Sequence, residues 1–195
     1  MWDRKPVGLF LLYAVPAGLG FPAGIWAYQA MALASLIATA ALVARLATRA
    51  GFAAGATASA LAYVLWFDLL GGQGGQSPVF YNLLMIGAAL LALRGTQRAG
   101  LAAMALVGVA LQIKYSVVFE GLFLGLWLLA DDWRARKSPG DLIGYGIALV
   151  ALAMLPTALA AVAYAAIGQW DAFVYANFLS ICLLYTSPSP RDLST

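Results

Sequence analysis

Three ionisable side chains lie within or beside long apolar runs, where a charge is costly. Asp68 ends one apolar run, Lys114 lies between two others, and Glu120 follows six residues after Lys114. A charge at membrane depth costs roughly 2.5–3.5 kcal/mol on insertion scales, so each residue is a functional candidate. Because six residues are nearly two helical turns, we expect Lys114 and Glu120 on roughly the same helix face.

Lys114 has the chemistry of a phosphate-binding residue. A fixed ammonium group at a membrane face is suited to neutralising a lipid-linked phosphate. Alternatively, Lys114 only extends to the lipid headgroups and pairs with nothing. Arg4 and Lys5 precede the first apolar segment. They are either part of such a site or an interfacial anchor.

A loop rich in glycine and glutamine, Gly71–Pro78, follows Asp68. Its backbone could approach a sugar hydroxyl closely, with Gln76 and Asn82 supplying hydrogen-bond donors and acceptors. Asp68 would belong to the same substrate-binding group, and Glu120 is a further candidate for it. The loop lacks the Gly-Lys-Ser/Thr ending of a phosphate-binding loop, and a plain flexible turn is the alternative.

The composition is that of a membrane protein. Hydrophobic residues make up 64% of the chain and charged residues 10%, with a mean hydropathy of +0.88. Soluble domains carry roughly 45–50% apolar and about 25% charged residues, so a soluble fold could not bury this much apolar surface. The net charge of +3 comes from short clusters between apolar runs, which indicates membrane orientation and not nucleic-acid binding.

Several kinds of site are disfavoured by the residue types present. The chain contains no histidine, and its only cysteine is Cys182. A zinc site, a histidine-based triad and a disulfide framework are therefore disfavoured, and neither a metal nor another cofactor is evident. Any chemistry must use carboxylates, lysine, arginine, tyrosine or amides.

The elements that must position these residues are predicted to be helices. Runs rich in Ala, Leu and Val predict an all-α fold, a polytopic transmembrane bundle of about six spans, since roughly 20 apolar residues cross the hydrocarbon. A short membrane-associated helix at Pro6–Gly20 comes first. The predicted spans are Ile25–Leu46, Phe52–Leu70, Val79–Leu93, Leu101–Ile113, Ser116–Ala130 and Leu142–Ile167. The fourth and fifth are short and resemble a helical hairpin with Lys114 at its turn.

Basic residues occur in alternate loops, as a single membrane orientation requires. They follow the first, third and fifth predicted spans, which assigns these loops to the cytoplasm: Arg45, Arg49, Arg94, Arg98, Arg134, Arg136 and Lys137. Lys114, the Gly71–Pro78 loop and a loop at Gln169–Asp171 then lie on the opposite side. We expect a multi-pass protein whose partners include membrane lipids.

The last residues of the chain break the apolar pattern. Residues Cys182–Asp192 resemble a translated sequencing adapter, and a flexible Ser/Pro terminus is the alternative. We therefore expect one membrane unit over residues 1–181 and a tail of non-native sequence over residues 182–195. On this interpretation Cys182 carries no function.

Two short segments resemble motifs of a known enzyme family. Asp3–Leu11 is similar to the charged, proline-bearing segment that closes the first periplasmic loop in membrane glycosyltransferases of the protein O-mannosyltransferase and aminoarabinose transferase type. Gly108–Tyr115 is similar to a later signature of these enzymes, a glycine-rich helix running into Thr-Lys-Tyr, with Ile113 in place of Thr. The resemblance implies the GT-C fold of that family.

The resemblance also implies an activity and a location. The enzyme would transfer a sugar from a polyprenyl-phosphate donor to an acceptor on the periplasmic side of the bacterial inner membrane. Lys114, with Arg4 or Lys5, would neutralise the leaving lipid phosphate, and Tyr115 would hold the sugar or the phosphate. The family's catalytic acid lies upstream of the Lys-Pro segment, so we expect it before Met1 and expect this chain to be a fragment.

Two other functions are compatible with the sequence. In a secondary transporter or lipid-linked sugar flippase, Asp68, Lys114 and Glu120 would line one pathway. Inverted repeats with broken helices are typical of many such transporters, and no convincing repeat is evident here. A non-catalytic membrane scaffold is the other possibility, although scattered charges in apolar segments would be unexpected in it.

Overall fold

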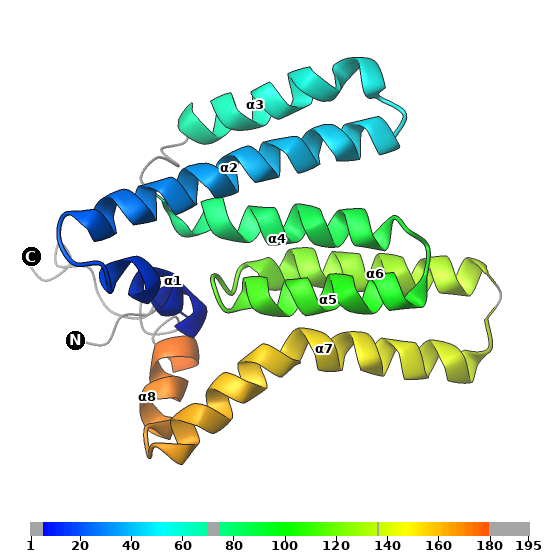
Figure 1. The fold of residues 1–195 in the computed structure, drawn as a ribbon. Helices are drawn as coiled ribbons and strands as arrows, with labels where there is room; N and C mark the ends of the chain where they lie inside the picture. Colours follow the sequence, from blue (N-terminus) through cyan, green and yellow to red (C-terminus); the bar gives the residue numbers. More distant parts are fainter. Residues whose placement is uncertain (1–5, 70–74, 136, 180–195) are drawn as a thin grey trace, which may run out of the picture.

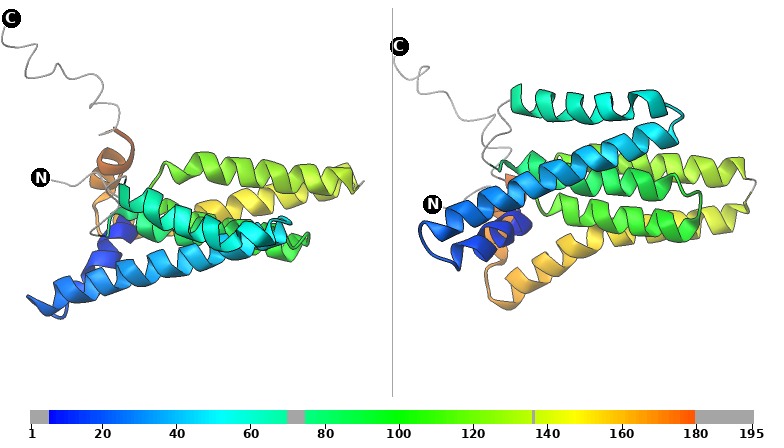
Figure 2. Two further views of the ribbon diagram at one scale, coloured as in Figure 1. Left: turned by 90° about the horizontal axis from the view of Figure 1, so that it is seen from above. Right: turned by 45° about the horizontal axis from the view of Figure 1, so that its top comes forward.

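The computed structural model describes residues 6–69, 75–135 and 137–179, and the regular elements in these residues are helices, which confirms the all-α prediction. The α-helices are α1 (Val7–Ala17), α2 (Ala23–Arg49), α3 (Ala56–Leu69), α4 (Ser77–Ala92), α5 (Gln97–Leu111), α6 (Val117–Arg134), α7 (Pro139–Ala166) and α8 (Trp170–Val174). Helices α2 to α7 lie alongside one another, and α1 and α8 lie at one end of this bundle (Figure 1). Two further views show the same arrangement (Figure 2).

Two of the helices are long and apolar enough to cross a bilayer, α2 with 27 residues and α7 with 28. At about 1.5 Å per residue, each is about 40 Å long, more than the roughly 30 Å of hydrocarbon. The described residues therefore provide two candidate spans and not the predicted six. The sequence-based prediction overestimated the number of spans because α3 to α6 are also largely apolar. These helices have only 14 to 18 residues and do not pass as candidate spans.

Helix α5 lies at the centre of the bundle, with α4, α6 and α7 packed around it. Its buried side chains are mostly small, and they are Ala99, Gly100, Ala103, Met104, Val107, Gly108, Ala110 and Leu111. A methyl group added at Gly108 would lie 2.7 Å from the carbonyl oxygen of Ala153 on α7. The two backbones can approach this closely only because position 108 has no side chain.

Helix α7 bends near its middle (Figure 1). Pro156 lies inside this helix, and proline removes one backbone hydrogen bond and collides with the preceding turn.

Beyond the bend, α7 ends at Ala166 and is followed by Gly168 at a φ of 70°, a left-handed conformation that favours glycine. The chain then enters α8 at Trp170, so the predicted Gln169–Asp171 loop is shorter than expected.

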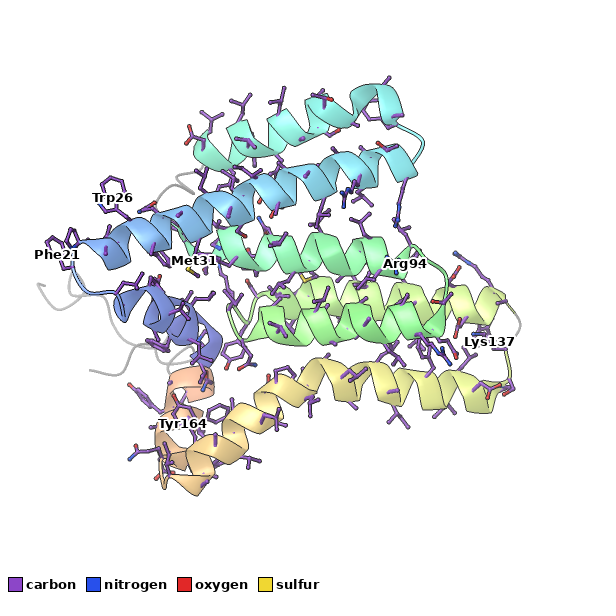
Figure 3. The ribbon with its side chains drawn as sticks, viewed as in Figure 1. Phe21, Trp26, Met31, Arg94, Lys137 and Tyr164 are labelled. Carbon is purple, nitrogen blue, oxygen red and sulfur yellow. The ribbon has the colours of Figure 1, made fainter. Side chains whose placement is uncertain are left out.

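The loops predicted to be cytoplasmic lie together at one end of the bundle, called here the basic end. The turns after α2, α4 and α6 all lie there, and Arg94 and Lys137 are labelled at this end (Figure 3). Lys137 pairs with Asp132 at 3.0 Å, and Asp132 also accepts a hydrogen bond of 2.7 Å from Gln97 on α5. The opposite end, called the Lys114 end, contains the turn between α5 and α6.

Much of the outer surface of the bundle is apolar. Exposed large side chains lie along both long helices and along α6, and they include Leu33, Ile37, Phe119, Leu122, Phe123, Leu126, Ile143, Ile147 and Val150. Trp26, near the start of α2, is also exposed, as Figure 3 shows. A surface of this size that is not covered by protein is typical of a membrane-facing or partner-facing wall.

The close approach of α5 and α7 gives a stability prediction. Gly108→Ala should lower the free energy of unfolding by about 1–3 kcal/mol, because the added methyl group forces the two backbones apart. The matched control is Gly144→Ala on α7, where nothing lies within 4 Å of the added methyl group. This control should be neutral or stabilising by up to about 1 kcal/mol. The measurement is denaturant unfolding in micelles, and equal stability of both variants would contradict this packing.

Candidate functional site

The turn between α5 and α6 presents Lys114 at the end of the bundle. The backbone N–H of Lys114 donates to the carbonyl of Ala110 at 3.0 Å, which fixes the turn against the last residues of α5. The side chain is exposed, and its ammonium group lies 6.0 Å from the ring centre of Tyr81 on α4. The ion pair within the described residues is the one at the basic end, so Lys114 has no carboxylate partner among them.

Helix α1 packs against this same turn. The N–H of Leu9 donates to the carbonyl of Gln112 at 3.2 Å, two residues before Lys114. A methyl group added at Gly8 would lie 2.7 Å from both Cβ and the carbonyl oxygen of Gln112. The two segments that carry the family resemblance, about one hundred residues apart in the sequence, are therefore in direct contact.

Two side-chain hydrogen bonds hold the turn against the C-terminal helices. The amide of Gln112 donates to the Thr157 hydroxyl on α7 at 2.7 Å, directly after Pro156. The Tyr115 hydroxyl donates to Asn177 Oδ1 at 2.5 Å. The turn is thus supported by α1 on one side and by α7 and the segment after α8 on the other.

Asn177 is buried within the π-helical turn Tyr175–Leu179. Its amide nitrogen donates to the carbonyl of Phe173 at 2.7 Å, so its carbonyl oxygen is directed to Tyr115. Burial raises the pKa of Tyr115 to about 12, with a smaller contribution from Tyr164. Tyr115 therefore stays neutral at physiological pH and acts as a hydrogen-bond donor within the protein.

The expectation that Lys114 and Glu120 share a helix face is not met. Lys114 lies in the turn and α6 begins only at Val117, so no helical spacing connects Lys114 with Glu120. Glu120 instead lines a cavity of about 690 Å³ between α2, α3, α4 and α6, together with Asn82. The amide of Asn82 donates to the Tyr63 hydroxyl on α3 at 3.2 Å. Two of the predicted substrate-binding residues thus meet in one cavity.

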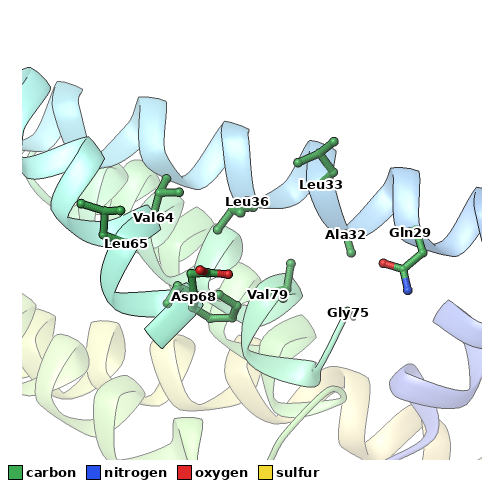
Figure 4. A pocket seen from close by; sticks show the side chains of 10 residues that line it. Gln29, Ala32, Leu33, Leu36, Val64, Leu65, Asp68, Gly75 and Val79 are labelled. Atoms are coloured by element: carbon green, nitrogen blue, oxygen red, sulfur yellow. The ribbon is translucent and has the colours of Figure 1, made fainter. Parts of the chain in front are cut away.

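Asp68 lies in a different, smaller cavity. This cavity of about 260 Å³ is enclosed by α2, α3 and the start of α4, and it also contains Gln29 and Gly75 (Figure 4). Tyr28 on α2 donates its hydroxyl proton to the carbonyl of Gly75, which fixes the end of the loop. The carbonyl of Val79, another residue that lines this cavity, accepts a hydrogen bond of 2.8 Å from the Ser35 hydroxyl on α2. Asp68, Lys114 and Glu120 therefore do not line a single cavity.

The remaining predicted site residues are Gln76, Arg4 and Lys5. Gln76 is exposed at the start of α4 and lines neither of the two cavities. Arg4 and Lys5 lie outside the described residues, as do residues 71–74 of the Gly71–Pro78 loop and the tail from Cys182. Within the described ranges, no group of three or more His, Cys, Asp or Glu side chains is placed to hold a metal ion.

Four residues that the sequence did not single out contribute to these sites: Tyr63, Tyr81, Gln112 and Asn177. Gln112 and Asn177 are amides in otherwise apolar segments, and this pattern could have identified them as candidate site residues from the sequence. The two tyrosines could not be identified in this way, because a tyrosine in an apolar helix is as often a packing residue as a functional one.

Comparison with known proteins gives no relative. No family model matches the sequence, and no curated protein or solved structure matches it.

The bond between Tyr115 and Asn177 gives a mutational prediction. Tyr115→Phe leaves the buried carbonyl of Asn177 without its donor, which should cost about 1–3 kcal/mol of unfolding free energy. Tyr175→Phe, at a side chain that is 41% exposed, is the control and should change stability little. Denaturant unfolding in micelles measures both. If the two variants lose the same amount, the Tyr115 bond does not stabilise the turn.

The raised pKa of Tyr115 predicts a loss of stability in alkali. The folded state favours the neutral phenol of Tyr115. Its contribution to the free energy of unfolding is therefore complete below pH 10.0, the ordinary pKa of tyrosine, and is lost as the pH rises to about 12. The measurement is the tyrosinate absorbance of the wild type minus that of Tyr115→Phe. The difference should titrate above pH 10.0, and a midpoint at pH 10.0 would contradict the burial.

Proposed function

We propose that this chain is part of a membrane glycosyltransferase, and that the Lys114 turn binds the phosphate of its polyprenyl-phosphate sugar donor. The observation that carries the proposal is the contact between α1 and the turn, through Leu9 and Gln112. Only two segments resemble the motifs of the protein O-mannosyltransferase and aminoarabinose transferase type, and they pack against each other. Chance resemblances would have no reason to meet in space.

The chemistry of the turn supports a phosphate ligand. Transfer of the sugar leaves negative charge on the departing lipid phosphate, and a positioned ammonium group stabilises that charge. Lys114 is exposed and lacks a carboxylate partner among the described residues, so its charge is available to a ligand. It also precedes the N-terminus of α6 by three residues, and that end of a helix favours anions.

Tyr115 contributes by positioning in this proposal. Its hydroxyl proton is donated to Asn177, so Tyr115 holds the turn, and with it Lys114, in place. The general base that activates the acceptor hydroxyl is not assigned to any residue of this chain.

In this proposal the chain lies in the inner membrane as a multi-pass protein, and the supporting observation is that two of the described helices are long and apolar enough to cross a bilayer. Helices α3 to α6 pack between or beside the two long helices, and their outward side chains are largely apolar. The basic end would face the cytoplasm, by the excess of arginine and lysine in cytoplasmic loops. Lys114 would then face the periplasm, the side on which lipid-linked sugars are used in this type of enzyme.

A transporter or lipid-linked sugar flippase is the competing function. It would need polar groups along one continuous path. In the described residues, Asp68 and Glu120 line two cavities, and Lys114 lines neither of them. This separation favours a site at one end of the bundle over a path through it.

Donor binding tests the proposal. In nanodiscs, Lys114→Ala should bind a short polyprenyl phosphate about 10- to 100-fold more weakly than the wild type, because a charged hydrogen bond is lost. Lys114→Arg should keep most of the affinity, since it keeps the charge. The measurement is a titration of the purified protein with the lipid phosphate, and with the uncharged polyprenol as reference ligand.

Lys137→Ala, at the basic end, is the matched control and should bind as the wild type does. Equal affinity of Lys114→Ala and the wild type would refute the phosphate site. Movement of a labelled lipid-linked sugar across a vesicle membrane, without transfer of the sugar, would favour the flippase.

A further inference from the structure

The cavity of about 690 Å³ that contains Glu120 lies apart from the Lys114 turn. Four helices contribute to its walls. The polar groups are Thr39 on α2, Tyr63 on α3, Asn82 on α4 and Glu120 on α6, and the other lining residues are Val43, Met85, Ile86, Ala89, Phe119, Phe123 and Leu124. Lys114 is not among the lining residues, so this site is distinct from the turn at the end of the bundle.

The cavity has one charged group and no counter-charge. Its walls contain the carboxylate of Glu120 but no lysine or arginine, and Glu120 has no ion pair among the described residues. Glu120 is exposed on the outer surface of α6, and beside apolar surroundings an ionised carboxylate is stabilised by pairing with a cation. A cation that enters with the ligand would supply that partner.

The neighbouring polar groups fit such a cation. The Asn82 amide nitrogen donates to the Tyr63 hydroxyl at 3.2 Å, which leaves the carbonyl oxygen of Asn82 to accept. The Thr39 hydroxyl donates to the carbonyl of Ser35 at 2.7 Å, so its oxygen also remains an acceptor. A primary ammonium group offers three donors, and the cavity supplies a carboxylate and neutral acceptors for them.

Polarity changes along the length of the cavity. Glu120 lies in the first turn of α6 and Asn82 in the second turn of α4, so both lie toward the Lys114 end. The apolar lining residues Met85, Ile86 and Ala89 follow on α4, extending about 10 Å toward the basic end at 1.5 Å per residue. A ligand that fits has a polar head at one end and an apolar tail at the other.

The cavity opens sideways, through the apolar wall of the bundle. Phe119 and Phe123 line it and are 75% and 71% exposed. A ligand would thus enter from the surroundings of the apolar wall and not from the end of the bundle. An amphiphile dissolved in a bilayer has this route available.

We propose that this cavity binds a single-chain amphiphile with a cationic amine head group, with the ammonium on Glu120 and the alkyl chain along Met85, Ala89 and Phe123. The proposal does not depend on the phosphate site. It also gives Glu120, a charge in an otherwise apolar helix face, a specific partner.

Photolabelling in phosphatidylcholine nanodiscs tests the site. The probe is hexadecylamine with a photoactivatable diazirine in its chain, and labelled residues are found by mass spectrometry. Labels should fall on the cavity residues of α4 and α6. Unlabelled hexadecylamine should compete about tenfold better than hexadecanol or hexadecyl sulfate, because only the amine pairs with the carboxylate.

Two variants and one control separate charge from packing. Glu120→Gln keeps the shape, should lower labelling about tenfold, and should abolish the preference for the amine over the alcohol. Asn82→Leu should reduce labelling less, because it removes a neutral acceptor. Asp131→Asn removes a carboxylate from the other end of the same helix and should be labelled as the wild type is.

Three results would overturn the proposal. The first is wild-type labelling of Glu120→Gln, and the second is equal competition by the amine and the alcohol, since either would leave only an apolar groove. The third is a set of cross-links between two copies of the chain at Phe119 and Phe123, which would assign the opening to a subunit contact.

Discussion

The close packing of α5 determines the geometry of the Lys114 turn. Its small buried residues include Gly100, Ala103 and Gly108, and Gly108 lets the backbone of α7 approach closely, while α4 and α6 pack on its other sides. A helix held on several sides cannot slide or rotate without opening its whole interface. The turn that follows it, with Lys114 and Tyr115, is consequently fixed relative to α4 and α7, and α1 and Asn177 add contacts to a turn that is already positioned.

Helix α4 connects the two sites. Tyr81 lies beneath the ammonium group of Lys114, and the next residue, Asn82, lines the cavity that contains Glu120. Since adjacent residues on a helix point about 100° apart, one turn of α4 can serve both sites at once. A ligand that shifted this turn in one site would change the geometry of the other. Coupling between the sites requires no other element.

The sequence predicted the elements better than the sites. Apolar runs and charge clusters gave the all-α class, the short first helix, the hairpin around Lys114 and the common end of the basic loops, because each depends on local composition. The prediction that Lys114 and Glu120 share one helix face was wrong, because Gln112 to Ser116 form a turn that interrupts helical periodicity. The partnership of Asn82 with Tyr63, like that of Tyr115 with Asn177, depends on how distant helices pack and has no local signal.

The unequal helix lengths leave the Lys114 turn short of the end of α2. Helix α2 extends beyond the start of α4 at the Lys114 end, and α1 returns across that end (Figure 1). In a bilayer thick enough for α2, the ends of the shorter helices α4, α5 and α6 would lie below the surface reached by α2. An ammonium group at that level is in a lower dielectric than bulk water, so its attraction to a phosphate is stronger. The short helices, which fail as independent spans, would thus set the depth at which a lipid phosphate meets Lys114.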